Sequence, residues 1–146
     1  MYLKEVLDYK NIILECFKTD PELIEKWHIE SNNNLEICVD RTFNDMKQAN
    51  VKFYKLEINN EIIGYFGHEI CGSTDYLTGF FIKPKYRNSE YIKQFWNNVY
   101  NIFNNKPFYC GIYRKNKKAY DFLIKNKGII VLSTEEVIVM KFKEEL

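Results

Sequence analysis

The sequence predicts an α/β (α+β) domain in which helices flank a mixed, mostly antiparallel sheet of about six to seven strands. Segments 51–58, 62–71 and 76–83 each show the period-two pattern of a strand, and short turns separate them. These segments are therefore expected to form an antiparallel meander. Beyond residue 88, helical and extended patterns alternate along the chain. This alternation predicts further strands that join the same sheet through helical connections.

The first fifty residues are expected to form one edge strand and three helices. Residues 2–6 fit a strand, and residues 9–17 place their apolar side chains on one helical face. The run Asp20-Pro21-Glu22 is a typical helix start, because Asp caps the helix, Pro fits the first turn and Glu favours the positive end of the helix dipole. Three apolar residues continue that face: Leu23, Ile24 and Trp27.

The remaining elements follow from the same two periodicities and from turn residues. Asn59-Asn60 is a two-residue hairpin turn, because Asn tolerates positive φ. The run Asn104-Asn105-Lys106-Pro107 is a helix stop. The expected helices cover 35–50, 89–104 and 116–126, and the expected later strands cover 108–113, 129–132 and 137–142.

Length and composition limit the classes of function. A chain of 146 residues, 46% hydrophobic and 28% charged, fits a single globular domain over residues 1–146. The net charge of +1 provides no broad field for nucleic acid or an anionic membrane. No apolar run approaches a membrane span and the N-terminus lacks a signal-peptide pattern, so a cytoplasmic protein is expected.

The cysteines and histidines do not indicate a metal site. The four cysteines lie far apart and form no C-x-x-C pair, and neither histidine has a partner at metal-ligand spacing. Isolated cysteines in such a chain are typically buried, reduced thiols. No metal is therefore expected.

Residues 80–96 carry the most informative pattern. An apolar strand ends at Pro84, a short polar loop follows, and a helix begins with apolar residues at Tyr91, Phe95 and Val99. A tight strand-to-helix turn presents free backbone N–H groups and the positive end of a helix dipole, which together suit a phosphate.

This pattern resembles the core motif of the GCN5-related N-acetyltransferase (GNAT) family, in which a strand ending in Val-x-Pro runs into a loop that wraps the pyrophosphate of acetyl-CoA. Ile82, Pro84, Tyr86 and Arg87 stand at the family's positions without an insertion. The three glycine positions of the family's loop instead carry Asn88, Glu90 and Ile92.

A second resemblance lies in the helix expected over 116–126. Asn116, Ala119 and Phe122 match the family's pattern at the start of the helix after the fifth strand. Leu123 occupies the position that commonly holds a tyrosine general acid, and Gly128 comes one residue late. The same residues also fit an ordinary amphipathic helix with an Asn cap and a C-terminal Gly. The order of elements matches the family across nearly the whole chain, with the first fifty residues matching only in outline.

The resemblance implies an N-acetyltransferase that uses acetyl-CoA as co-substrate and a primary amine of a small molecule or protein as acceptor. The backbone N–H groups of Phe81 and Ile82 would polarise the thioester carbonyl. Glu69 is the first candidate for the general base, Asp75 the second, and Tyr120 is the candidate for the missing acid. The implied acetyl-CoA-binding residues are Phe81, Ile82, Arg87, Asn88, Ser89, Glu90, Tyr91, Ile92 and Asn116.

The substituted glycines keep other interpretations open. A carboxylate of Glu90 directed at the pyrophosphate would cost about 4 kcal/mol at ~4 Å and an effective dielectric near 20. One alternative is a catalytically inactive protein of the same fold that serves as a binding or assembly module. Another is an unrelated α+β module whose motifs match by accident.

Overall fold

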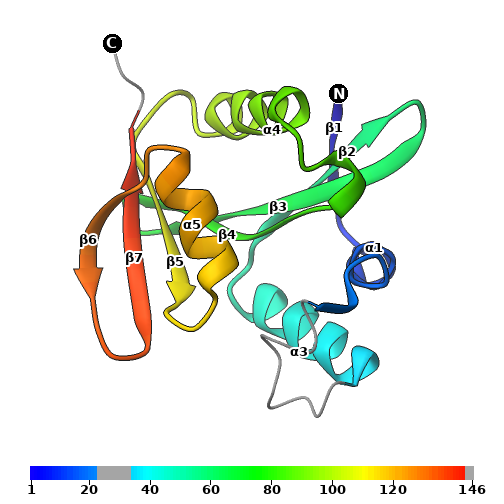
Figure 1. The fold of residues 1–146 in the computed structure, drawn as a ribbon, viewed down its shortest axis with the longest axis horizontal. Helices are drawn as coiled ribbons and strands as arrows, with labels where there is room; N and C mark the ends of the chain where they lie inside the picture. The colour runs from blue at the N-terminus through cyan, green and yellow to red at the C-terminus, as the bar shows by residue number, and fades with distance from the viewer. Residues whose placement is uncertain (23–33, 144–146) are drawn as a thin grey trace.

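A computed structural model of the chain describes residues 1–22 and 34–143. Its seven strands form one mixed sheet in the order β1-β2-β3-β4-β5-β7-β6 (Figure 1). The strands are β1 (Tyr2–Val6), β2 (Lys52–Ile58), β3 (Glu61–Cys71), β4 (Thr74–Ile82), β5 (Phe108–Tyr113), β6 (Ile129–Ser133) and β7 (Val137–Phe142). The helices are α1 (Lys10–Phe17), α3 (Leu35–Gln48), α4 (Ser89–Ile102) and α5 (Lys117–Lys125), with a short 3-10 turn, η2 (Pro84–Tyr86), before α4.

The predicted sheet is confirmed, and its only parallel neighbours among the described strands are β4 and β5. The expected hairpin turn between β2 and β3 is also confirmed, because Asn59 and Asn60 have φ values of 51° and 66°. The helix expected from Asp20 begins as predicted, since Pro21 and Glu22 are helical. Its continuation through Leu23, Ile24 and Trp27 lies outside the described residues.

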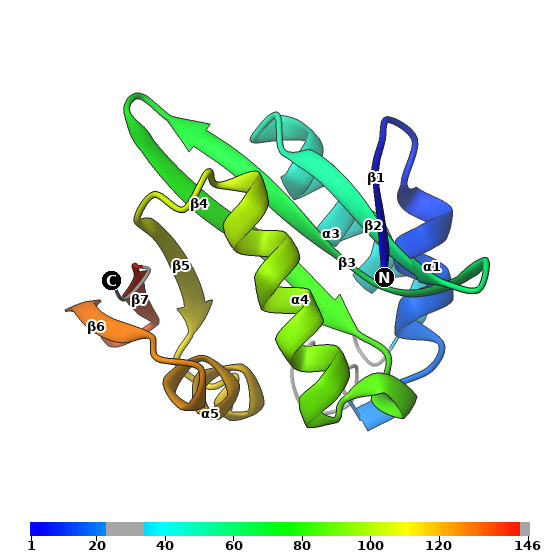
Figure 2. The same cartoon turned by 90° about the horizontal axis from the view of Figure 1, so that it is seen from above.

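Helices cover both faces of the sheet and make two hydrophobic clusters. From above, α4 lies on one side of the sheet, and α1 and α3 lie on the other (Figure 2). The first cluster joins Phe95 and Val99 of α4 and Leu123 of α5 to the strands. The second joins Ile13 of α1 and Val39 of α3 to the opposite face. The apolar spacing of each helix therefore decides which face of the sheet it buries.

A β-bulge interrupts β4 where the strand enters the centre of the molecule. Phe66 of β3 pairs with Phe80, but His68 pairs with Leu77, so β4 carries an extra residue in between. Gly79 lies in this bulge with φ of +76°, a conformation that glycine adopts without steric cost. The bulge changes the direction of β4 immediately before the segment with the predicted site.

No helix within the described residues is both long enough and apolar enough to cross a membrane.

Candidate functional site

A crevice opens between the two parallel strands of the sheet. The ladder between β4 and β5 consists of one pair, Tyr76 with Tyr109, near the start of each strand. Toward the carboxyl ends of the strands lies a cavity of about 540 Å3. Residues from β4, β5, the start of α4 and α5 line it. Other parts of the chain contribute Phe17, Asp20, Thr42, Tyr65 and Val137. The two strands therefore diverge beyond this pair.

The edge of β4 beside the crevice carries backbone groups that can receive a ligand. The N–H of Lys83 donates to the carbonyl of Ile63 in β3 at 2.8 Å. Because successive backbone groups of a strand point to opposite sides, the N–H of Phe81 also faces β3, whereas those of Phe80 and Ile82 face the crevice. The predicted pair of donors, Phe81 and Ile82, is therefore replaced by Phe80 and Ile82. The carbonyl of Ile82 lies on that same side, where it accepts from Nε of Arg87 at 2.7 Å.

The junction between β4 and α4 is a capped helix start. The side chain of Asn88 accepts from the N–H of Tyr91 at 3.2 Å, which satisfies one of the free donors of the first turn. The N–H groups of Ser89 and Glu90 belong to the same turn, where a helix has no intrahelical acceptor for them. The predicted frame for an anion is therefore present at the start of α4.

The substituted glycine positions differ in what their side chains do. The side chains of Asn88, Ser89 and Glu90 are exposed to solvent, and none of the three lines the cavity. Ile92 does line the cavity, half-buried. Residues two apart on a helix point in nearly opposite directions, so Glu90 and Ile92 cannot both face the crevice. Of the three substituted glycine positions, Ile92 is thus the one whose side chain takes up space in the cavity.

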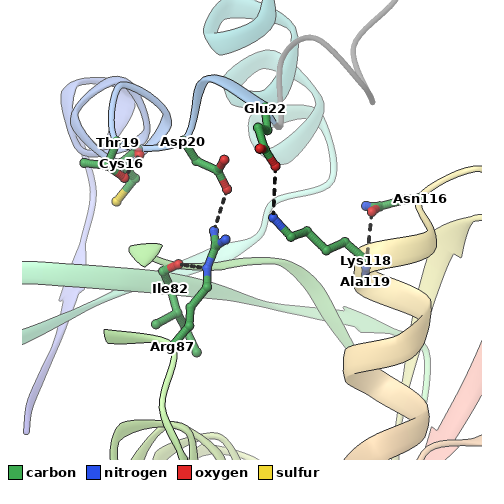
Figure 3. Close-up of polar contacts among 9 residues, drawn as sticks. All are labelled: Cys16, Thr19, Asp20, Glu22, Ile82, Arg87, Asn116, Lys118 and Ala119. Carbon is green, nitrogen blue, oxygen red and sulfur yellow. Dashed lines mark hydrogen bonds and ion pairs between the residues drawn. The ribbon is translucent and has the colours of Figure 1, made fainter. Parts of the chain in front are cut away.

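Arg87 is held by a buried carboxylate that sequence reasoning missed. Its Nη2 donates to Oδ2 of Asp20 at 2.8 Å, and Asp20 is only 5% exposed (Figure 3). The guanidinium also lies over the ring of Phe81, with Cζ 5.2 Å from the ring centroid. The sequence indicated Asp20 only as a helix cap, because its partner lies 67 residues away. Both residues line the cavity, so the guanidinium of Arg87, one of the residues that the resemblance implies for acetyl-CoA binding, is already paired.

Two further ion pairs join the region around α1 to the crevice. Nζ of the buried Lys83 lies 3.3 Å from Oε1 of Glu15. Lys118 of α5 lies 3.7 Å from Glu22, and both side chains are largely exposed (Figure 3). Asp20 and Glu22 therefore reach from one segment to opposite sides of the cavity, one toward α4 and the other toward α5.

The start of α5 forms the second wall of the crevice. The carboxamide oxygen of Asn116 accepts from the N–H of Ala119 at 3.2 Å, so Asn116 caps α5 as predicted. Four residues of this region line the cavity: Asn116, Lys118, Ala119 and Phe122. Leu123, at the position of the expected tyrosine acid, is fully buried in the core.

The candidate acid and base residues lie outside the cavity lining. Glu69 accepts hydrogen bonds from the hydroxyl of Thr78 at 2.9 Å and from the thiol of Cys71 at 3.1 Å. Asp75 is bonded to Nε2 of His68 at 2.8 Å. Tyr120 packs half-buried against the core formed by α4 and α5. The structure therefore brings Phe81, Ile82, Arg87, Ile92 and Asn116 together at the cavity, but not Glu69 or Tyr120.

Two titratable groups of the cavity wall stay neutral near pH 7. Burial raises the pKa of the Cys110 thiol to about 12. Burial also raises the pKa of Tyr65 well above its ordinary value. Because a thiolate, not a thiol, is the effective nucleophile, Cys110 is poorly suited to carry an acyl group. Neither side chain is therefore an effective nucleophile near pH 7.

No cluster of three or more metal-ligating side chains occurs in the described part of the chain.

The fold is shared with solved acetyltransferase structures, although no protein-family model and no curated protein matches the sequence. The PaiA N-acetyltransferase of Thermoplasma acidophilum, solved with coenzyme A, is 18% identical with a TM-score of 0.63, covering 99% of this chain and 100% of that one. A GCN5-related N-acetyltransferase of Rhodopseudomonas palustris is 9% identical with a TM-score of 0.65, covering 98% and 95%. The N-acetyltransferase PseH of Campylobacter jejuni, solved with acetyl coenzyme A, is 16% identical with a TM-score of 0.56, covering 99% and 100%. The predicted resemblance is thus confirmed, and this chain has the fold of the GCN5-related N-acetyltransferases.

Proposed function

We propose that the protein is an N-acetyltransferase that binds acetyl-CoA in the crevice between β4 and β5 and transfers the acetyl group to a primary amine of a small molecule or protein. The observation that carries the proposal is the divergence of β4 and β5 beyond Tyr76 and Tyr109 into a cavity that reaches the start of α4. The cytoplasm is the expected location.

Positioning and backbone polarity would supply most of the rate enhancement. The amine nitrogen attacks the thioester carbon, the C–S bond breaks, and the leaving thiolate of coenzyme A takes up the proton that the amine releases. The N–H groups of Phe80 and Ile82 face the crevice and are placed to stabilise the oxyanion. These donors need no particular side chain, so the substitutions in the loop leave this part of the chemistry intact.

Proton transfer would run through water rather than through direct contact with a carboxylate. Glu69 and Tyr120, the residues proposed for this role, lie outside the cavity lining. Asp20 lines the cavity but is committed to Arg87. A water chain that takes the proton from the amine and, through bulk solvent or Glu69 at the far part of β3, returns a proton to the leaving thiolate is consistent with this arrangement.

Ile92 favours the alternative of a binding or assembly module without catalysis. Its side chain takes up space in the cavity at a position where close approach of a pyrophosphate calls for glycine. Arg87 favours the same alternative, because its ion pair with Asp20 reduces the positive charge available to a phosphate.

Calorimetric titration of the full chain with acetyl-CoA and with coenzyme A tests the proposal. We expect binding in the micromolar to low millimolar range, and about tenfold tighter binding in Ile92→Gly. Lys93→Gly is the matched control, because it carries the same helical cost of about 1 kcal/mol on an exposed position of α4. No binding at millimolar ligand to either the natural chain or Ile92→Gly would favour the non-catalytic module.

A second pair of variants tests the role of Glu90. Because the Glu90 side chain is exposed and outside the cavity lining, Glu90→Gly is expected to tighten binding less than Ile92→Gly. Glu36→Gly, in the first turn of α3, is the control for the loss of an acidic residue at a helix start. A larger gain in affinity from Glu90→Gly than from Ile92→Gly would show that charge repulsion by Glu90, and not the size of the Ile92 side chain, limits binding.

A further inference from the structure

The outer strand β6 exposes an unusual amount of apolar surface. It forms the edge of the sheet beside β7, and both views show it at the outside of the molecule (Figures 1 and 2). All five of its residues are exposed, and four of them are consecutive and branched: Ile129 at 53%, Ile130 at 43%, Val131 at 49% and Leu132 at 55%. An exposed apolar edge strand is a template for pairing with another chain.

The opposite edge of the same sheet is built differently. The edge strand β1 exposes Lys4 and Glu5 between its apolar residues. Charged side chains on an edge strand are a common protection against unwanted pairing. The β6 edge carries no charged residue within Ile129–Ser133, so the two edges of one sheet differ in their suitability for association.

The apolar surface continues from β6 onto the neighbouring strands. Leu132 lies opposite Val139 of β7, and Val137 of β7 lies opposite Tyr113 of β5, which is itself 54% exposed. The buried residues of β7 alternate with these and face the core, so Val137 and Val139 belong to the opposite face, on which Val137 and Tyr113 also line the crevice. A partner at the β6 edge therefore finds an apolar face beside the open strand.

The charges that flank β6 indicate which partner fits. Lys125 and Lys127 precede the strand, Glu135 and Glu136 follow it, and all four are exposed. A second copy that pairs antiparallel brings the basic end of each strand to the acidic end of the other. A parallel copy would bring like charges together. The edge is therefore self-complementary about a two-fold axis, as an isologous interface must be.

We propose that the protein forms a homodimer through antiparallel pairing of β6 with β6 of a second copy, which joins the two seven-stranded sheets. An axis through Val131, the middle residue of β6, brings Lys127, in the turn before the strand, toward Glu135 of the second copy, in the turn after it. Val131 also forms a bulge in the ladder with β7, which interrupts regular pairing at the centre. The contact is thus short, and we expect a dissociation constant of about 1–100 µM.

Sedimentation of the full chain over about 1–500 µM tests the proposal, since this range brackets the expected dissociation constant. The mass should rise from monomer to dimer, and Ile129→Lys and Leu132→Lys should each weaken association at least about tenfold. Ile70→Lys is the matched control, because Ile70 is 58% exposed on β3, far from β6 in the sheet. A chain that stays monomeric throughout, or a dimer that the β6 variants leave unchanged, overturns the proposal.

Charge reversal separates antiparallel self-pairing from other contacts that involve the same strand. Lys127→Glu and Glu135→Lys should each weaken the dimer, and the double variant should restore association toward the natural level. Thermal unfolding of each variant checks that the fold persists. If the double variant loses as much dimer affinity as both single changes together, the antiparallel arrangement is ruled out, even if a dimer exists.

Discussion

The two strand-to-helix junctions that border the crevice are alike in local design and differ in how firmly they are held. Asn88 caps α4 and Asn116 caps α5, each by accepting from the N–H three residues on. The β4–α4 junction also carries the buried pair of Arg87 with Asp20. The β5–α5 junction carries instead the longer, exposed ion pair of Lys118 with Glu22.

This difference shows where the site is preorganised. Tertiary contacts fix the start of α4 from three directions, since Lys83 pairs with Glu15, Arg87 with Asp20, and the hydroxyl of Tyr86 bonds Glu61. The start of α5 is tied instead by its own cap and by exposed hydrogen bonds to the turn between β6 and β7, where Arg114 donates from Nε to the carbonyl of Thr134 at 2.9 Å and from its backbone N–H to the carbonyl of Glu136 at 2.8 Å. We therefore expect the α4 side of the crevice to keep its shape on ligand binding and the α5 side to adjust.

The largest expected effect is on stability, from removal of Arg87. In Arg87→Ala the carboxylate of Asp20 stays buried without its partner, which typically costs about 3–5 kcal/mol. Urea unfolding measures the loss, and Asp20→Asn in the same background should recover part of it because the uncompensated charge is gone. A loss below about 1 kcal/mol would show that the two junctions are held equally loosely.

The two caps should contribute equally, which tests whether the junctions share their local design. Asn88→Ala and Asn116→Ala are each expected to cost about 1 kcal/mol in urea unfolding. Asn→Asp at the same positions is the control, since Asp keeps the acceptor and suits the helix dipole. If the two variants lose unequal free energies of unfolding, the junctions differ in local structure and not only in tertiary contacts.

The exposed pair at α5 should matter least among the ion pairs. Both side chains are more than 60% exposed, so Lys118→Ala should reduce the free energy of unfolding by at most about 1 kcal/mol. The effect should disappear in 0.5–1 M salt, because the Debye length then falls to about 3–5 Å and exposed charges are screened from each other. If Lys118→Ala matches Arg87→Ala in cost, the comparison between the two junctions fails.

The bond between Tyr86 and Glu61 adds a small pH dependence to the α4 side. The hydrogen bond from Tyr86 lowers the pKa of Glu61 below its ordinary value of 4.5. A carboxyl with a lowered folded-state pKa stabilises above pH 4.5, and this contribution is lost as the pH falls through the folded-state value. The stability difference between the natural chain and Tyr86→Phe should therefore shrink below pH 4.5. A difference that stays constant from pH 7 to 3 would exclude this bond as its source.

The Asp20–Arg87 pair and Ile92 mark the limit of what local patterns predict. The caps at Asn88 and Asn116 follow from the residue types beside apolar runs of helical period. The pairing of Asp20 with Arg87 needs a segment after α1 to reach the end of β4, which no local pattern describes. The helical phase that separates Ile92 from Glu90 is local, but which face of α4 meets the crevice depends on packing against β4 and α5.

The sequence by itself determined the elements, the mixed sheet and the strand-Pro-Arg-helix frame, because period, turn chemistry and capping act over a few residues. Only the tertiary structure decided that Arg87 is paired with Asp20, that Ile92 occupies the cavity and that β6 is left uncovered. Each of these depends on which distant segments meet, and that is set by packing of the whole chain rather than by local preference.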